Sequence, residues 1–165
     1  MSESLPLLAD DAPAAERHAV LLQTLDALLL GERDLIANLA NASALLMGVL
    51  PQLNWAGFYL SKGDGLVVGP FQGKPACVRI AFGRGVCGTA AAERRTVLVP
   101  NVHAFPGHIA CDSASQSEIV VPLLTADSRL IGVMDLDSPI LSRFDSADAT
   151  ALESFAARLV AGCEL

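Results

Sequence analysis

The sequence has no long apolar run, few basic residues and little aromatic character. Its apolar stretches end well short of the roughly 18 uninterrupted residues that a membrane-spanning helix needs, which argues against a membrane protein. Acidic residues stand near the N-terminus, in MSESLPLLADDAPAAER, where a secretory signal would carry its basic region. We therefore expect a cytoplasmic protein.

Positive charge is scarce and is not clustered. The chain has 11 Lys and Arg residues against 18 Asp and Glu residues, which gives a formal net charge of −7. Nucleic-acid binding depends on clustered basic side chains that displace counterions from phosphates, so we expect no nucleic-acid partner. The charge favours a small molecule or a protein as the ligand.

The composition predicts one packed domain. Hydrophobic residues make up 52% and charged residues 18% of the 165 residues, and this length fits a single core. We predict a flexible N-terminal arm over residues 1–17 and a single domain over residues 18–165.

The spacing of apolar residues changes along the chain. A helical period predicts one helix through residues 20–29, a second over residues 32–50 that Pro51 ends, and a last helix capped by Asp145 or Ser146. Between them lie short runs rich in β-branched and aromatic residues, separated by turn sequences such as KGDG and TADS. This order predicts an α+β fold with a central, mostly antiparallel sheet of about six strands packed with helices.

A G-x-G-x-x-G pattern occurs at Gly83, Gly85 and Gly88. It is typical of dinucleotide-binding sites, but only within an N-terminal βαβ unit of a parallel sheet. The predicted elements do not form that unit, so we interpret the glycines as residues of a tight strand-to-helix turn. Cys87 lies near the start of the predicted helix, where backbone N–H groups could favour its thiolate.

Three of the four cysteines, Cys77, Cys87 and Cys111, lie at predicted loops or element edges. Cys163 falls on the apolar face of the last helix and is predicted to be a core residue. In a cytosolic protein such cysteines are more often thiols, metal ligands or redox groups than permanent disulfides. We therefore look for function among the first three.

Two other chemistries could use these cysteines. His103 and His108 could complete a zinc site with Cys111, although the cysteine spacing contains no C-x-x-C pair. Alternatively, His108 could act as the base of a Cys/His hydrolase with Cys111 as its nucleophile. The sequence identifies no third group to orient that histidine.

Three acidic residues are predicted to lie near Cys111. Asp135 and Asp137 stand two apart in the predicted strand RLIGVMDLD and therefore point to the same face, and Glu118 opens the strand after the Cys111 loop. If the two strands pair, the carboxylates form a receptor for a cation such as an ammonium group, and their repulsion raises the pKa of at least one of them. A solvated acidic edge is the simpler alternative.

Trp55, Gly57 and Tyr59 share one face of the predicted strand NWAGFYL. Two aromatic rings around a glycine suggest a shallow pocket for a small, flexible ligand. An ordinary core strand would give the same pattern.

Taken together, NWAGFYL, GPFQGKPACVRIAFGRGVCG, NVHAFPGHIACDSASQSEIVVPL and GVMDLDSP strongly resemble the GAF-domain free methionine-(R)-sulfoxide reductases. GERDLIANLANASALL is also similar to that family, so the resemblance covers nearly the whole chain from about residue 18 onward. Three cysteines with this spacing are typical of the enzyme branch, whereas GAF domains at large mostly bind ligands. The resemblance implies a GAF fold and the reduction of free methionine-(R)-sulfoxide.

The resemblance also implies a role for each candidate site residue. Cys111 matches the catalytic cysteine of the family, Cys77 the resolving cysteine, and Cys87 a third cysteine whose part is less settled. Glu118, or an aspartate acting through water, is the expected proton donor to the sulfoxide oxygen. Five residues match the family's substrate pocket: Trp55, Tyr59, Glu118, Asp135 and Asp137.

The same resemblance implies the partners. We expect no metal or organic cofactor, a Cys77–Cys111 disulfide that thioredoxin recycles, and a protein that is often a homodimer. The alternative function is a non-catalytic GAF domain that binds a small ligand or senses redox state.

Overall fold

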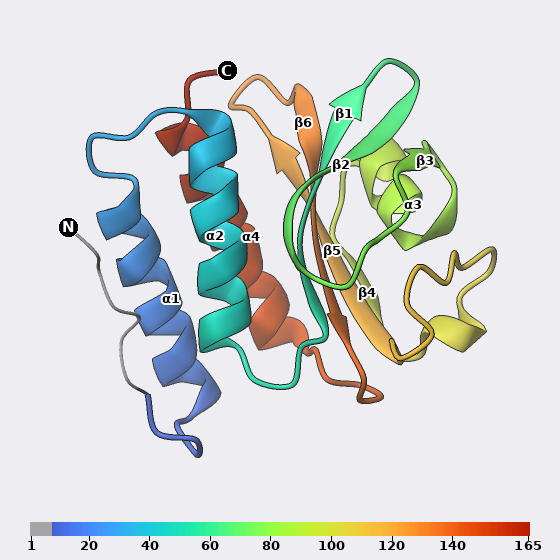
Figure 1. Cartoon of the computed structure of the whole chain (residues 1–165), viewed down its shortest axis with the longest axis horizontal. Coiled ribbons are helices and arrows are strands. Elements are labelled where there is room, and N and C mark those ends of the chain that lie inside the picture. The colour runs from blue at the N-terminus through green and yellow to red at the C-terminus, as the bar shows by residue number, and fades with distance from the viewer. Residues whose placement is uncertain (1–7) are drawn as a thin grey trace.

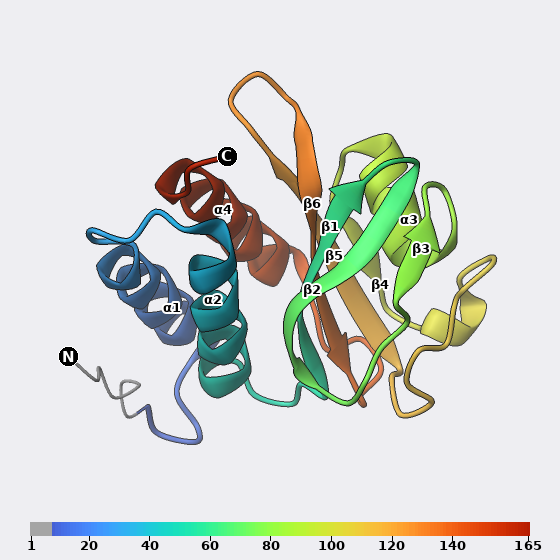
Figure 2. The same ribbon diagram turned by 45° about the horizontal axis from the view of Figure 1, so that its top comes forward.

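The computed structural model describes residues 8–165, which form one sheet with helices on both faces (Figure 1, Figure 2). One face carries a helical layer of α1 (Ala14–Leu28), α2 (Leu35–Val49) and α4 (Ser146–Gly162). The other face carries the short helix α3 (Gly85–Glu93) and the 3-10 turn η1 (Val102–Ala104). No helix among these residues combines the length and the apolar character that would let it span a membrane. The arrangement confirms the predicted α+β class.

The sheet has six strands in the order β3-β2-β1-β6-β5-β4. Every neighbouring pair is antiparallel, which confirms the predicted sheet. The order places β1, β6 and β5 side by side at the centre. The strands are β1 (Trp55–Lys62), β2 (Gly65–Gly73), β3 (Arg79–Ala81), β4 (Val97–Val99), β5 (Ser117–Leu124) and β6 (Leu130–Ser138).

Two of the long helices begin at capping aspartates. Asp34 accepts a hydrogen bond from the backbone N–H of Ala37 at the start of α2. Asp145 accepts from the N–H groups of Ala147 and Asp148, and the Asp148 carboxylate accepts from the N–H of Asp145, which completes a capping box. Of the two caps predicted for α4, the structure therefore uses Asp145.

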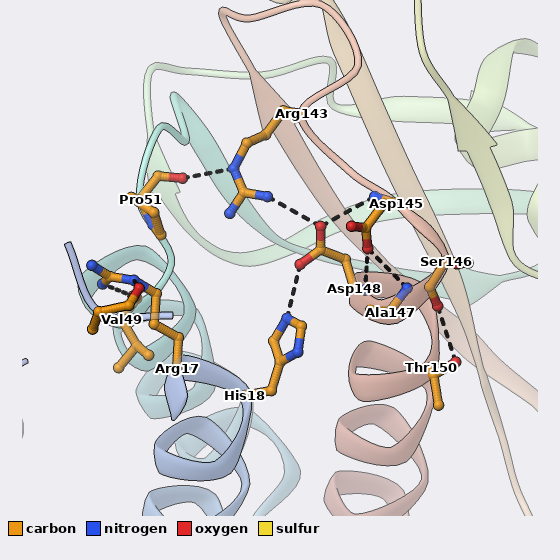
Figure 3. Close-up of polar contacts among 11 residues, drawn as sticks. Arg17, His18, Val49, Pro51, Arg143, Asp145, Ser146, Ala147, Asp148 and Thr150 are labelled. Atoms are coloured by element: carbon orange, nitrogen blue, oxygen red, sulfur yellow. Dashed lines mark hydrogen bonds and ion pairs between the residues drawn. The ribbon is translucent and has the colours of Figure 1, made fainter. Parts of the chain in front are cut away.

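A cluster of polar side chains holds α1 against the start of α4 (Figure 3). Asp148 Oδ1 lies 2.8 Å from His18 Nε2, and Asp148 Oδ2 accepts a hydrogen bond of 3.1 Å from Arg143. Arg17 donates to the carbonyl of Val49 at the end of α2 and to three carbonyl groups just before α1. These contacts join α1, α2 and α4 at the end of the helical layer where α4 begins.

The structure describes the second part of the predicted N-terminal arm, residues 8–17. Its first seven residues lie outside the described residues, but α1 already begins at Ala14. Alanine and glutamate at positions 14–16 are strong helix formers. Pro13, directly before the helix, has a φ of −59°, which suits a helix start. The division into an arm and a domain at residue 18 stays a prediction.

Apolar side chains pack on both faces of the sheet. The larger core lies under the helical layer and includes Phe58, together with Cys163, which is confirmed as a buried core residue. The second core lies under α3 and includes Trp55 and Tyr59. The side chains of β1 therefore point alternately into the two cores. Trp55 and Tyr59 share one face and Phe58 lies on the other, as the alternation in the sequence predicted.

Candidate active site

A pocket opens on the face of the sheet opposite the helical layer. Its floor consists of side chains from β1, β5 and β6, and its walls are α3, the 74–76 segment and the loop that contains Cys111. Cys77 is joined to this pocket through a disulfide bond to Cys111. The other predicted site residues line the pocket directly: Trp55, Tyr59, Cys87, Cys111, Glu118, Asp135 and Asp137.

Strand pairing brings the three acids together. Glu118 on β5 lies opposite Asp137 on β6, and Trp55 on β1 lies opposite Asp137 on its other side. Asp135 stands two residues before Asp137 and points to the same face. Glu118 and Asp135 are only 6% and 5% exposed, so the alternative of a solvated acidic edge is wrong.

Burial changes the protonation of these acids. The loss of solvent raises the pKa of Glu118 well above its usual range, and the charges of Asp135 and Asp137 raise it further. Burial and then the charge of Asp135 raise the pKa of Asp137 in the same way. Burial also raises the pKa of Asp135 to about 7. The carboxyl groups of the pocket therefore retain protons near neutral pH.

The thiol in contact with the acids is Cys87. Its Sγ lies 3.9 Å from Oε1 of Glu118, and burial, followed by the charges of Asp135 and Glu118, raises the pKa of Cys87 well above its usual value. The predicted thiolate at the start of α3 is therefore wrong, because burial, the largest cause, and the neighbouring acidic groups outweigh the helix dipole. Cys87 is a buried, protonated thiol.

The same cluster has a spacing that could hold a metal ion. Cys87 Sγ and one carboxylate oxygen each of Glu118 and Asp135 lie within 4.8 Å of one another. Metal ligands must be deprotonated, whereas the raised pKa values favour the protonated form of all three groups. Within the described residues, Asp135 Oδ1 is buried without a hydrogen-bond partner. This acceptor and its neighbours suit a ligand that donates hydrogen bonds or carries an ammonium group.

Cys77 and Cys111 form a disulfide with their Cα atoms 5.6 Å apart. Cys77 lies in the loop between β2 and β3, and Cys111 lies in the loop between η1 and β5. Both cysteines are half-buried, so the bond borders the pocket and the solvent. The alternative of a zinc site formed by His103, His108 and Cys111 does not fit this state, because the Cys111 sulfur is bonded to carbon and sulfur rather than present as a thiolate.

His108 lies beside Glu118, with Nε2 at 3.8 Å from Oε2. Burial and the charge of His103 lower the pKa of His108, while the raised pKa of Glu118 keeps that carboxyl protonated. The contact therefore joins two neutral groups rather than an ion pair. This arrangement fits a positioning role for His108 better than the role of a base.

Aromatic rings stack at the floor of the pocket and in the core beside it. Trp55 stacks between Tyr59, at 5.8 Å between ring centroids, and Phe71, at 5.2 Å. The position of Phe71 is not evident from the sequence, because the β1–β2 register shifts between Gly57 and Tyr59. Counting from the turn therefore does not reveal which residue lies beside Trp55. Gly57 allows the close approach, since a Cβ there would lie 2.3 Å from Phe71 Cβ.

The glycine pattern forms the turn into α3. Gly83 and Gly85 have φ values of +77° and +61°, which glycine adopts without strain. A Cβ on Gly88 would lie 2.4 Å from the carbonyl oxygen of Ala81. These requirements explain the three glycines as turn residues, as predicted.

Comparisons with known proteins agree with this fold and site. A GAF domain model matches residues 15–161. The chain is 52% identical to a free methionine-R-sulfoxide reductase from Escherichia coli, with 87% of both chains covered, and 44% identical to one from Saccharomyces cerevisiae, with 87% of this chain and 83% of that protein covered. The X-ray structure of the Neisseria meningitidis free methionine-R-sulfoxide reductase in complex with its substrate superimposes with a TM-score of 0.89 at 45% identity, covering 96% of this chain and 95% of the other. The chain therefore belongs to the GAF domain family, in the branch of the free methionine-(R)-sulfoxide reductases.

Proposed function

We propose that this protein reduces free methionine-(R)-sulfoxide to methionine, with Cys111 as the nucleophile. One observation supports this most strongly: the Cys77–Cys111 disulfide borders a pocket that contains three buried acids. A half-buried disulfide beside protonated carboxyl groups is the arrangement expected of a thiol-dependent reductase in its oxidised state. The names of the relatives support the same reaction.

The first step needs a thiolate and a proton. The Cys111 thiolate attacks the sulfoxide sulfur and Glu118 protonates the sulfoxide oxygen. The resulting hydroxyl group moves to Cys111 Sγ as the bonds that join the substrate sulfur to this oxygen and to Sγ both break. Methionine leaves, and Cys111 carries a sulfenic acid, so the sulfoxide is reduced by two electrons and the thiol is oxidised by two. Glu118 suits the role of donor because its raised pKa keeps it protonated near neutral pH.

Binding of the substrate changes which of the three acids are protonated. A free amino acid brings an ammonium group, which stabilises ionised carboxylates and lowers their pKa values. Asp135 and Asp137 would then ionise around the ammonium group, while Glu118 faces the sulfoxide oxygen. A peptide-bound methionine sulfoxide has an uncharged amide in place of this ammonium group, so the acids would select the free amino acid.

The second step regenerates the enzyme. The Cys77 thiolate attacks the sulfenic sulfur of Cys111, water leaves, and the disulfide seen in the structure forms. An external dithiol, for which we propose thioredoxin, reduces this bond by exchange. This cycle uses no metal or organic cofactor. A cycle that ends with reduction of the disulfide suits the reducing cytoplasm, where we propose that the protein acts. A homodimeric state stays a proposal.

The test measures methionine formation and the consumption of reduced thioredoxin after addition of free methionine-(R)-sulfoxide. We expect turnover with the free (R) isomer, and much less with the (S) isomer or with an N-acetylated amide. Dithiothreitol in place of thioredoxin separates the reductase reaction from the choice of reductant. Absence of methionine with either reductant would contradict the proposal.

Cysteine variants assign the two steps. Cys111→Ser should abolish methionine formation, whereas Cys77→Ser should release one methionine per enzyme and then stop with thioredoxin. Cys163→Ala is the matched control, because Cys163 lies in the helical core away from the pocket. Full steady-state turnover of Cys77→Ser would indicate that Cys87 resolves the sulfenic acid instead.

The second candidate function is a sensor domain that binds a small ligand without turnover. Its pocket could be the same one, because ammonium recognition by buried acids does not require catalysis. Such a protein would bind methionine sulfoxide in calorimetry but would consume no reduced thioredoxin. The position of the disulfide at the border between the pocket and the solvent favours the enzyme.

A further inference from the structure

The two redox cysteines lie in separate irregular segments that are anchored on one dipeptide, Asn54–Trp55. Asn54 directly precedes β1, and its backbone N–H donates to the carbonyl oxygen of Asp137 at 3.0 Å. This bond extends the pairing of β1 with β6 by one residue. The anchor is therefore part of the sheet rather than part of either loop.

Asn54 holds the Cys111 loop. Its Nδ2 donates two hydrogen bonds of 3.1 Å, one to Oδ2 of Asp112 and one to Oγ of Ser115. Asp112 Oδ1 also accepts from the backbone N–H of Ala114 at 2.9 Å, which fixes the carboxylate within its loop. Within the described residues, Asn54 Oδ1 is buried without a hydrogen-bond partner. The side-chain hydrogen bonds of Asn54 thus go to the loop that carries Cys111.

Trp55 holds the Cys77 segment. Its indole N–H donates to the carbonyl oxygen of Lys74 at 3.2 Å, three residues before Cys77. Gly73 makes this approach possible, because a Cβ there would lie 2.7 Å from Trp55 Cδ1. Lys74 Nζ also lies 3.7 Å from Asp112 Oδ1, but the lysine side chain is 73% exposed, so this ion pair adds little.

We propose that Asn54 is a positioning residue: through Asp112 and Ser115 it keeps Cys111 within bonding reach of Cys77 while the disulfide is open. Two thiols on tethered segments react in proportion to their effective concentration, which rises when the segments are held in the bonded geometry. Asn54, just before β1, and Trp55, its first residue, hold them there from adjacent positions. The role of this contact in turnover rests on the proposed reductase cycle.

The test measures the effective concentration of the Cys77–Cys111 pair by equilibration with reduced and oxidised glutathione. Asn54→Ala should lower it by about tenfold, as expected for the loss of a hydrogen bond to a charged group. Asn101→Ala is the matched control, because Asn101 caps η1 on the same chain connection but does not contact Asp112. The urea midpoint of each reduced variant separates a local effect from a loss of global stability.

A double-mutant cycle identifies the contact. Asp112→Ala should also lower the effective concentration, and the double variant should fall by clearly less than the two single losses combined, because the Asn54–Asp112 bond is lost in both single variants. Additive effects, or an unchanged value for Asn54→Ala, would overturn the proposal. If Asn54→Ala does not fold, Asp112→Ala in the Cys111 loop supplies the same test. The measurement uses no methionine sulfoxide, so its failure is distinct from failure of the proposed reductase activity.

Discussion

Three properties of Glu118 support its proposed role as the proton donor. It is buried, its pKa is raised, and it contacts both the Cys87 thiol and His108. None of these neighbours is a cation that would hold the carboxyl in its ionised form. A protonated acid at this position can give its proton to a reacting oxygen and recover a proton from water.

Glu118→Gln should lower kcat roughly 10²- to 10⁴-fold in the methionine sulfoxide assay, because the amide retains a hydrogen-bond donor but cannot transfer the proton. Oxidation of Cys77 and Cys111 by a chemical oxidant should be unaffected. Glu93→Gln, at the exposed end of α3, is the control and should retain wild-type turnover. Wild-type kcat in Glu118→Gln would move the proton donor to Asp135 or Asp137.

Asp135→Asn should make stability less dependent on pH. The pKa of Asp135 is raised from 3.8 to about 7, so between these values the folded state binds a proton that the unfolded state has lost. Stability from this group is therefore full below about pH 4 and falls as the pH rises toward 7, by at most roughly 1.4 kcal/mol per pH unit.

Urea unfolding between pH 4 and pH 8 checks this sign. The wild-type free energy of unfolding should decrease with pH more steeply than that of Asp135→Asn, although Glu118 and Asp137 still contribute in the same direction. Asp64→Asn, in the exposed β1–β2 turn, should keep the wild-type slope. Parallel curves for Asp135→Asn and the wild type would mean that Asp135 is ionised in the folded protein.

At the scale of elements, two aspartates stabilise the start of α4 in different ways: Asp145 caps the helix, and Asp148 pairs with Arg143 and His18. Asp145→Ala removes the helix cap and should lower the free energy of unfolding by about 1 kcal/mol. Asp148→Ala should cost more, roughly 3–5 kcal/mol, because it leaves the mostly buried Arg143 without its carboxylate and frees His18. Ser146→Ala, which leaves the cap in place, is the control. Urea titration gives the order, and equal losses for the two aspartates would contradict it.

The sequence was sufficient for the type and order of the elements because periodicity and caps are local signals. The alternation in NWAGFYL identified the face that carries Trp55 and Tyr59, and the spacing of Asp135 and Asp137 placed both on one side of a strand. The pairing of β5 with β6 then brought Glu118 to them, as expected if those strands were neighbours.

Other features of the site depend on how distant segments pack. The contact of Cys87 with the acids arises because α3 lies over β5 and β6, and no local pattern encodes that placement. Phe71 packs beside Trp55 because of a register shift, and Asn54 reaches the Cys111 loop across 58 residues of sequence. Such contacts need the tertiary structure.

At the scale of the whole molecule, the two faces of the sheet have different covers. The helical layer covers one face with the larger core, whereas the face with the pocket is covered by a short helix and loops. The disulfide links two of these loops, 34 residues apart in sequence. It therefore restrains the less regular half of the fold.

Reduction of the Cys77–Cys111 bond should lower the free energy of unfolding by about 3–4 kcal/mol, the chain-entropy contribution expected for a loop of this length. Urea unfolding with and without a reductant measures the difference. Cys77→Ser should resemble the reduced protein and should not respond to the reductant. Equal midpoints for the oxidised and reduced wild type would mean that the unfolded chain is not restrained by the bond.

The buried acids also change how the protein behaves in an electric field. The net charge of −7 and the sequence isoelectric point near 4.8 treat every carboxyl group as if it were free in water. In the native fold Glu118, Asp135 and Asp137 retain protons well above that pH, so the native isoelectric point lies higher than the sequence value. Unfolding at neutral pH releases these protons, and the denatured chain migrates as the more acidic species.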